Sequence, residues 1–535
     1  MPRRTPRLGF NDDEKAKIDE YLARKVDLEN KRRDLLQELE QVDSRITEMQ
    51  ADYGAIYNKR NPILRLPVEV TCLIFTLARL PRIAVTVEDD SSDDSSDDDD
   101  EMEEEEAEVD GLMEVVVSQV CRQWRAISLG FPRLWNTFYF EADASRPLPL
   151  ERFDAYMERS VTLPLRIWFD FKPGTNGFNN ALLVERAIRH AHRWQHFTLY
   201  SGDEAVMKTL RRLRDLSAPM LLSLTLAPGI ELTDDESEEA VEESLREVAS
   251  LDPVIFKGGT PKLTYSMLDG YSIRHALPPL SNLTILRIEK HLSDDIPVFE
   301  PGSLLELLSL PSLTQLSLVG DIIQPLTTPP NCIQMPSMKR LRVGEFDAIW
   351  DLLPSIRAPQ LDTLIIHMCH SPYGLAEEES FGHYSLPELR KLYVIDSNLE
   401  LTVIHSFIQA TRQATDVLIS HDDISTSALQ RIVDERCADV VWPRLKTLSC
   451  ITSGQRINTL LMFAGCRPRH SFTFRIPALM LEGWEEGMQA LGAVSMVDLR
   501  VGGWELNEPF WPPNVGPTSR FDFGRDDSFS LGDHL

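Results

Sequence analysis

Cysteine is scarce in this chain of 535 residues, and its seven cysteines never form a Cys-x-x-Cys pair. Their odd number and wide spacing argue against a disulfide framework and are typical of reduced thiols in the cytoplasm or the nucleus. The sequence also lacks a hydrophobic run of membrane-spanning length, and no apolar stretch follows the N-terminal arginines. We therefore expect neither membrane insertion nor secretion.

Positive charge is in deficit as well. The net charge is −29, and an acidic tract at residues 88–110 supplies −16 of it, which leaves −13 for the rest of the chain. Nucleic-acid binding needs concentrated Lys and Arg that displace counterions from phosphates. We therefore expect no nucleic-acid partner.

Recognisable catalytic motifs are missing. There is no Walker-type phosphate loop, no Gly-x-Ser-x-Gly and no His-Glu-x-x-His. The best metal-like groups are His367-Met-Cys-His370 and the trio His190, His192 and His196, but neither has a second ligand group at a known spacing. We interpret them as strand-end and surface histidines, and we expect no enzyme activity, cofactor or metal.

What is present begins with a heptad pattern over residues 14–57, behind a flexible tail at 1–13. Ten of its twelve seam positions are apolar: Ile18, Tyr21, Lys25, Leu28, Arg32, Leu35, Leu39, Val42, Ile46, Met49, Tyr53 and Ile56. Sustained alternation by three and four predicts a coiled-coil helix. The pattern fits a homodimer through residues 14–57, and it fits equally a helix that packs back on the chain itself.

A small helical module is predicted at residues 58–140. Pro67 can start a helix, and Val70, Ile74 and Leu77 follow it at helical spacing. A second apolar stripe with spacings of 4, 4 and 3 ends near the helix-stop signals Gly130 and Pro132: Val116, Val120, Trp124 and Ile127.

The two parts of this module together resemble an F-box. The resemblance rests on Asn61-Pro-Ile-Leu-Arg-Leu-Pro-Val-Glu-Val-Thr-Cys-Leu-Ile-Phe75, Val120-Cys-Arg-Gln-Trp-Arg125 and Pro132-Arg-Leu-Trp135. A heptad helix running into Pro-Ile-Leu-Arg-Leu-Pro resembles basidiomycete F-box-like proteins. The resemblance implies a docking module for the Skp-type adaptor of a cullin–RING ubiquitin ligase. By the same resemblance, the adaptor-binding residues are Leu66, Pro67, Ile74, Val120, Cys121 and Trp124, whereas Trp135 closes the core.

The module is interrupted by an insert that we place at residues 82–111. Residues 88–110 contain sixteen acidic residues and no basic ones, so like-charge repulsion predicts a disordered, solvated loop. Ser91, Ser95 and Ser96 each have an acidic residue three positions later, as acidophilic-kinase sites do. The insert is either an inert spacer or a regulatory phosphorylation tract.

After Trp135 the chain repeats the unit Pro-x-Leu-x-x-Leu-x-Leu. Copies begin at Pro219, Pro311, Pro336, Pro359, Pro387 and Pro443, and the middle ones lie 25, 23 and 28 residues apart. This period and the terminal Leu-x-Leu predict a leucine-rich-repeat-like α/β solenoid with a parallel sheet at residues 150–505, followed by a flexible tail at 506–535. First strands are expected at 163–169 and 194–199, and a hidden copy at 416–419.

Side chains between the buried leucines should point outward on the concave sheet and form columns across the repeats. One column would contain Arg287, Ser317, Arg342, Ile365, Tyr393 and Ser449, and its neighbour Ile285, Gln315, Arg340, Thr363, Lys391 and Thr447. Clustering of Arg287, Arg340, Arg342 and Lys391 around Tyr393 suits an acidic or phosphorylated substrate segment. The alternative is an ordinary solvated sheet face.

These observations predict a substrate-receptor subunit of an SCF-type ligase. The F-box would bind the Skp-type adaptor and through it the cullin scaffold, and the repeats would bind a protein substrate that the sequence does not identify. The alternative is a non-catalytic coiled-coil and solenoid scaffold that recruits no ligase.

Overall fold

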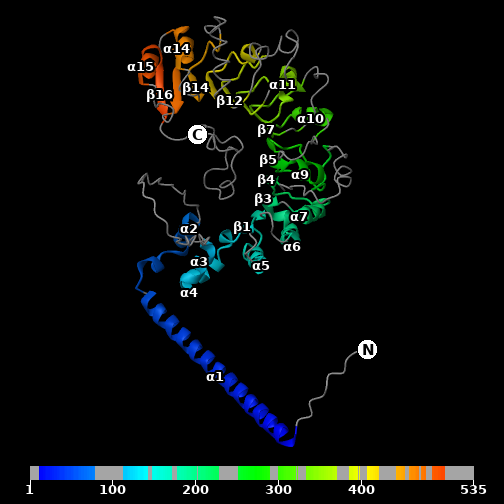
Figure 1. Ribbon diagram of the computed structural model, residues 1–535, viewed down its shortest axis with the longest axis vertical. Helices are drawn as coiled ribbons and strands as arrows, with labels where there is room; N and C mark the ends of the chain where they lie inside the picture. The colour runs from blue at the N-terminus through cyan, green and yellow to red at the C-terminus, as the bar shows by residue number, and fades with distance from the viewer. Residues whose placement is uncertain are drawn as a thin grey trace. The chain divides into compact units, whose positions relative to one another are not determined.

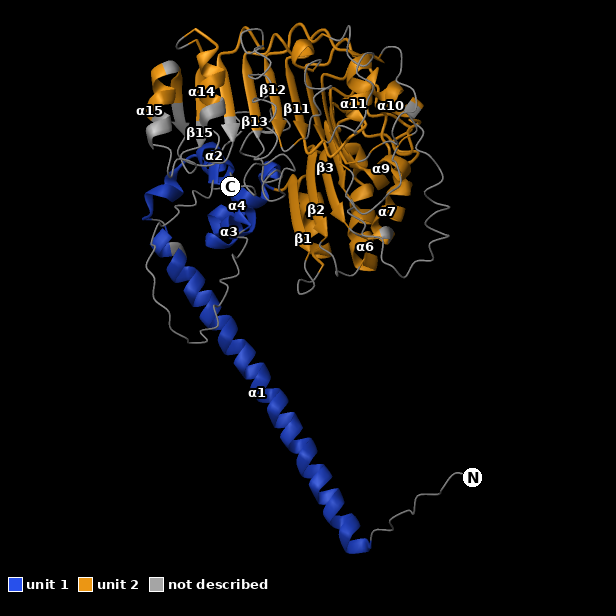
Figure 2. Ribbon diagram, turned by 45° about the horizontal axis from the view of Figure 1, so that its top comes forward, with its two compact units in different colours: residues 1–79, 90–134 blue, residues 80–89, 135–535 orange. Residues whose placement is uncertain are grey.

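The computed structural model divides into two compact units, unit 1 (residues 1–79 and 90–134) and unit 2 (residues 80–89 and 135–535) (Figure 2). The structure describes residues 11–58, 60–78, 112–142, 148–171, 177–201, 203–227, 251–289, 299, 301–320, 322, 333–369, 385–395, 397, 407–420, 441–451, 457–468, 471–477 and 485–500. The predicted acidic insert and the tail at 506–535 lie outside these residues, as does nearly all of the tail at 1–13.

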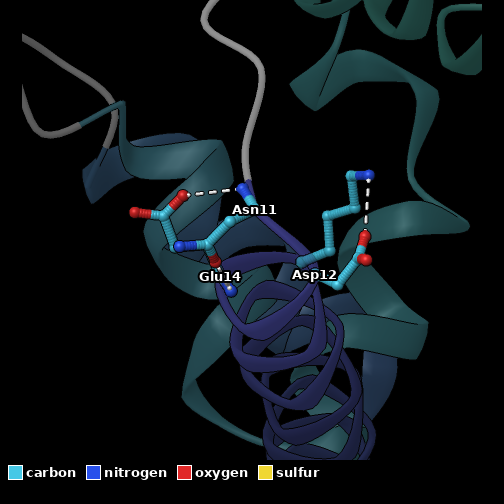
Figure 3. A network of polar contacts seen from close by, with 4 residues as sticks. Asn11, Asp12 and Glu14 are labelled. Atoms are coloured by element: carbon cyan, nitrogen blue, oxygen red, sulfur yellow. Dashed lines mark hydrogen bonds and ion pairs between the residues drawn. The ribbon is translucent and has the colours of Figure 1, made fainter.

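Unit 1 begins with the long helix α1, Asp12–Asn58. Asn11 and Glu14 cap its start reciprocally, because the Glu14 backbone N–H donates to Asn11 Oδ1 at 2.8 Å and the Asn11 N–H donates to Glu14 Oε2 at 2.9 Å (Figure 3). The acidic first turn also suits the positive end of the helix dipole. The helix therefore starts two residues before the predicted boundary at residue 14.

The remaining elements of unit 1 are short helices: η1 Pro62–Arg65, α2 Val68–Ala78, α3 Met113–Val120, α4 Arg122–Leu129 and η2 Pro132–Leu134. As predicted, Pro67 directly precedes a helix, and its carbonyl accepts the Thr71 N–H at 3.0 Å. The predicted single stripe from Val116 to Ile127 is wrong, because Cys121 has φ −158° and ψ 166° and separates α3 from α4. Cys121 instead caps α4, with its Sγ accepting the Trp124 N–H at 3.4 Å.

Unit 2 contains a sheet of fourteen strands that follow one another in chain order, and every pair is parallel. The strands are β1 Thr137–Ala142, β2 Leu165–Phe171, β3 Trp194–Ser201, β4 Ser223–Ala227, β5 Tyr265–Asp269, β6 Ile285–Glu289, β7 Gln315–Val319, β9 Arg340–Gly344, β11 Thr363–His367, β12 Lys391–Ile395, β13 Asp416–Ser420, β14 Thr447–Ile451, β15 Thr473–Pro477 and β16 Met496–Arg500. A separate pair consists of β8 Ile333–Gln334 and β10 Ile356–Arg357. The predicted α/β class with a long N-terminal helix and a large parallel sheet is confirmed.

Helices connect the strands within unit 2, and Figure 1 shows α6, α7, α9 and α10 on one side of the strands. The helices are α5 Leu150–Arg159, α6 Gly177–Ile188, α7 Glu204–Leu210, α9 Gly270–His275, α10 Pro301–Leu308, α11 Ile349–Leu352, α14 Ile457–Gly465 and α15 Glu485–Val494. The 3-10 turns are η3 Ala191–Arg193, η4 Arg211–Leu213 and η5 Leu353–Ser355. Between β2 and β3, α6 ends at Ile188 and Ala191 lies in η3.

The boundary between the units differs from the predicted one. Strand β1 precedes residue 150 and pairs with β2, so the sheet already begins within the predicted helical module. Trp135 is fully buried in unit 2, where its ring lies 5.2 Å from that of Tyr156 and under the guanidinium of Arg159. The contacts divide the chain between Leu134 and Trp135, and Trp135 closes the core of the sheet unit instead of the helical module.

The same turn recurs before seven of the fourteen strands of the sheet. The N–H of the first leucine of the unit donates to the carbonyl three residues earlier at Leu221, Leu263, Leu283, Leu313, Leu361, Leu389 and Leu445. All seven side chains are buried. The central leucines of the unit then align in one buried row through the parallel register: Leu224, Leu286, Leu316, Leu341, Leu364, Leu392 and Leu448. The core of unit 2 follows from this repeated placement of leucine.

Candidate partner-binding surfaces

The two segments that flank the acidic tract in sequence meet in one helical cluster of unit 1. The Phe75 ring on α2 lies 5.0 Å from the Trp124 ring on α4 in an edge-to-face arrangement, and Phe75 is fully buried. Gln123 Nε2 donates to the Leu64 carbonyl at 2.9 Å, which ties α4 to η1. The insert therefore leaves the two halves of the module in contact.

The residues predicted to bind an adaptor fall into two groups. Pro67 and Val120 are exposed, whereas Leu66, Ile74, Cys121 and Trp124 are half-buried. Trp124 contributes to the internal packing of the cluster through Phe75, so only part of its ring is open to a partner. The arrangement brings all six residues into one unit of the chain.

A larger set of exposed apolar side chains lies on the same helices. We name it the module surface; it consists of Val68, Val70, Leu73, Leu77, Val116 and Val120, which are 39–57 % exposed. Of these six residues, only Val120 was predicted from the sequence as an adaptor contact. The structure buries Thr71 and Phe75, which lie four residues apart on α2, and turns the apolar face of this helix outward. The position of Thr71 four residues before Phe75 was the signal in the sequence that could have indicated the buried face. Exposed apolar side chains in this number on two short helices favour a partner-binding role.

Cys72 lies on α2 beside this surface. Burial, and secondly the negative charge of Glu69, raise the pKa of the Cys72 thiol above its ordinary value. The group therefore stays a protonated thiol at neutral pH, which suits a packing role better than a reactive one.

The two predicted side-chain columns on the sheet are confirmed by the strand register. Arg287, Ser317, Arg342, Ile365, Tyr393 and Ser449 align, and so do Ile285, Gln315, Arg340, Thr363, Lys391 and Thr447, with β13 inserted before the last member of each. The expectation that they point into solvent is wrong for much of both columns. Arg287 and Arg342 are 9 % and 3 % exposed, and Ser317, Ile365, Thr363, Thr447 and Ser449 are also buried. The cause is the close spacing of the strands: side chains on neighbouring strands, about 4.8 Å apart, pack against one another, so long side chains cover the short ones beside them.

This burial changes the candidate substrate site. Arg287 forms an ion pair with Glu289 through a side chain that is 11 % exposed, so a local carboxylate already balances its charge. Arg340, Lys391 and Tyr393 are half-buried and remain accessible from solvent. The accessible part of the predicted site therefore spans β9 to β12.

An aromatic cluster that the sequence did not predict lies on the same face of the sheet. Tyr139 stacks on Trp168 at 4.2 Å between ring centroids, and Trp168 contacts Tyr200 at 6.0 Å. Ala227, Met267 and Tyr265 complete the cluster. The register places Trp168 in line with Thr198, and Met267 in line with Arg287, so this cluster extends the first column toward β1.

No family model and no curated protein matches this chain. Within the part of the chain that the structure describes, no helix combines the length and the apolar character needed to cross a bilayer. The described residues also contain no set of three or more His, Cys, Asp or Glu side chains placed to hold a metal ion.

The two histidine groups noted in the sequence have different surroundings in the structure. His367 is buried at the end of β11, and His370 lies outside the described residues. Cys369 between them is buried, and desolvation raises the pKa of its thiol to about 12. A thiol that stays protonated is a poor metal ligand, because thiolate is the coordinating form.

In the other group, burial is the main cause that lowers the pKa of His190 and of His196. Burial and then the positive charge of Arg166 lower the pKa of His196 to about 4, while its Nδ1 lies 3.1 Å from Ser223 Oγ. Burial also lowers the pKa of His190, with Arg193 as the second cause. Both side chains favour the neutral form, whereas His192 is exposed.

The low pKa of His196 predicts a loss of stability in acid. An unfolded histidine titrates near 6.5, so between about pH 6.5 and pH 4 the unfolded chain binds a proton that the folded chain does not. The free energy of unfolding of unit 2 should fall across this window by about 1–2 kcal/mol, since partial solvent access reduces the full effect. Urea unfolding at pH 7 and pH 4.5 measures it. His196→Asn should flatten the decline, and an unchanged decline in that variant would contradict the assignment.

Proposed function

We propose that this chain is the substrate-receptor subunit of an SCF-type cullin–RING ubiquitin ligase. In this proposal the helices of unit 1 are an F-box that binds the Skp-type adaptor and, through it, the cullin scaffold. Unit 2 binds a protein substrate, and the chain contributes no catalytic group of its own. The proposed place of action is the cytoplasm or the nucleus.

The observation that carries this proposal is the joining of the two F-box-like segments. Phe75 against Trp124 and Gln123 against the Leu64 carbonyl bring residues on both sides of the insert into one cluster. That cluster keeps a buried interior around Phe75 and Val117 while the module surface stays exposed. Apolar side chains at the centre of an interface contribute most of its binding energy. The module surface, together with Leu66 and Pro67, is the proposed contact with the adaptor.

The second part of the proposal concerns the sheet. We infer that residues 150–505, together with β1, form a leucine-rich-repeat-like solenoid. The recurring turn, the buried leucine row and the chain-order parallel strands support this inference. Arg340, Lys391 and Tyr393 are the proposed substrate contacts, because guanidinium and ammonium groups suit an acidic or phosphorylated segment.

The acidic insert enters the proposal as a regulatory tract. Ser91, Ser95 and Ser96 lie outside the described residues, and their acidic neighbours are the support for phosphorylation at these positions. Each phosphate would add further negative charge next to the module. An inert spacer is the alternative, and the deletion described below tests whether the tract inhibits docking.

Co-purification with a Skp-type adaptor tests the proposal. Leu66→Ala/Pro67→Ala and, separately, Val120→Asp should reduce the adaptor recovered with the full chain by about tenfold or more, since both changes remove apolar contact area. Val26→Asp on α1 is the matched control, because Val26 and Val120 are equally exposed at 55 %. It should bind as the wild type does. Equal recovery with all four proteins would overturn the proposed contact.

A version without residues 88–110 separates the roles of the insert. If the wild type and the deletion variant bind the adaptor equally well, the proposal is supported. The tract is then either an inert spacer or a regulatory tract that does not affect docking by itself. Binding only after the deletion supports a tract that inhibits docking. Absence of binding by either protein overturns the ligase function and favours the scaffold that recruits no ligase.

A further inference from the structure

Helix α1 exposes nine of the ten apolar residues of its seam. Nine apolar seam residues are 47–74 % exposed: Tyr21, Leu28, Leu35, Leu39, Val42, Ile46, Met49, Tyr53 and Ile56. Within unit 1, the described residues therefore leave this part of the seam uncovered. A helix of 47 residues with a long, largely apolar seam needs a partner to bury it.

The surface of α1 shows what shape of partner fits. A shallow hollow on the helix is lined by Tyr21, Arg24, Lys25, Leu28, Glu29 and Arg32. These six residues form two overlapping sets of four, residues 21, 24, 25, 28 and residues 25, 28, 29, 32. Both sets have the spacing of the holes that accept a side chain of a facing helix in a coiled coil. The hollow thus lies on the predicted seam and fits an apolar side chain from another helix.

Charge identifies the orientation of that helix. Residues 24–33 carry five basic and two acidic side chains, whereas residues 38–52 carry five acidic and one basic. A parallel, in-register pair would place like charges together, with Lys25 facing Lys25 and Arg32 facing Arg32 within the seam. An antiparallel pair places the basic half against the acidic half of the second copy. Lys25 then faces Met49, and Arg32 faces Val42.

We propose that α1 pairs with α1 of a second copy as an antiparallel coiled coil, with residues 24–33 against residues 38–52. Leu35 of each copy faces Leu39 of the other at the centre of the pair. At 1.5 Å per residue, this register separates the two Asn58 ends by about 60 Å. The dimer would present two helical modules at opposite ends of one rod. The inference does not depend on the proposed ligase function.

Mass measurement in solution tests the pairing with the full chain. At micromolar concentration the expected mass is twice 60.9 kDa. Leu28→Asp should raise the dimer dissociation constant on the order of a hundredfold, since it places two charges in the seam. Val26→Asp should leave it unchanged, because Val26 is as exposed as Leu28 but lies off the seam. A monomeric wild type would overturn the proposal. The partner of the α1 seam would then be an acidic helix from a different protein.

Disulfide trapping tests the orientation. Chains carrying Lys25→Cys mixed with chains carrying Met49→Cys should give a cross-linked dimer, and Lys25→Cys chains alone should not. Wild type under the same oxidation controls for the native cysteines, of which Cys466 is exposed. Cross-linking of Lys25→Cys alone, at an efficiency above that of the mixture, would overturn the antiparallel arrangement and support a parallel one.

Discussion

Phe75→Ala should destabilise the helical cluster of unit 1 by about 3–5 kcal/mol, the usual cost of truncating a fully buried phenylalanine. Phe75 has no exposed surface and lies against Trp124, so the substitution removes the contact that joins the two halves of the module. A cluster of short helices buries little other apolar area, and a loss of this size is comparable to its whole stability. We therefore expect local unfolding of residues 112–129.

Hydrogen exchange of the amides in residues 112–129 measures this effect, because it reports local opening separately from unit 2. Leu73→Ala is the matched control, since Leu73 lies on the same helix and is 57 % exposed. It should change stability by less than about 1 kcal/mol and still weaken adaptor binding. Equal protection of these amides in wild type and Phe75→Ala would contradict the central role given to this contact.

The contrast between Phe75 and Leu73 also shows what the sequence could specify in the module. Pro67 and the spacing of the apolar residues were sufficient to predict α2. They were insufficient to predict which face is buried, because Val70, Leu73 and Leu77 resemble core residues and Thr71 resembles a surface one. A partner surface and a core have the same composition in such a short helix. The break at Cys121 was missed because its extended backbone has no signal in a run of helix-compatible residues.

The sheet was more predictable, since each copy of its repeat fixes one strand. The alternation of leucines set the register correctly from β6 to β14. Strand β5 was missed because Pro261-Lys-Leu-Thr-Tyr-Ser-Met-Leu268 has Ser266 where the other copies have leucine. Ser266 is fully buried and aligns with Leu224 and Leu286 in the buried leucine row. A strand therefore belongs to the repeat because of its place in the sheet register, even where the residue in the row is not leucine.

Burial of the polar columns could not be predicted from one strand at a time. Whether Arg342 reaches solvent depends on side chains of neighbouring strands, which lie some 25 residues away in sequence. The same is true of the pairing between Arg287 and Glu289, whose charges appear independent in the sequence but neutralise each other on β6. Local pattern therefore predicts which face a residue occupies, and packing of several strands decides its accessibility.

Leu392→Asp should have an effect as large as that of Phe75→Ala, in the other unit. Leu392 is fully buried in β12 and aligns with Leu364 and Val417 on the neighbouring strands. A carboxylate at this position would lose its hydration without gaining a partner in an apolar row, which we expect to cost about 4 kcal/mol or more. The urea midpoint of unit 2 and the yield of folded protein measure the effect.

Lys391→Asp is the decisive comparison for this experiment, because residue 391 precedes Leu392 on the same strand and points to the opposite face. Its side chain is half-buried beside Thr363 and Asp416 in register, so the change adds a like charge next to Asp416 and should cost about 1–2 kcal/mol, still well below the cost of Leu392→Asp. If Lys391→Asp were the more damaging change, the strand would be shifted by one residue and the two faces exchanged. If it is tolerated, the same variant becomes a folded protein with reversed charge at the proposed substrate contact. Loss of substrate binding by that variant could then be attributed to recognition, since the fold of unit 2 would be intact.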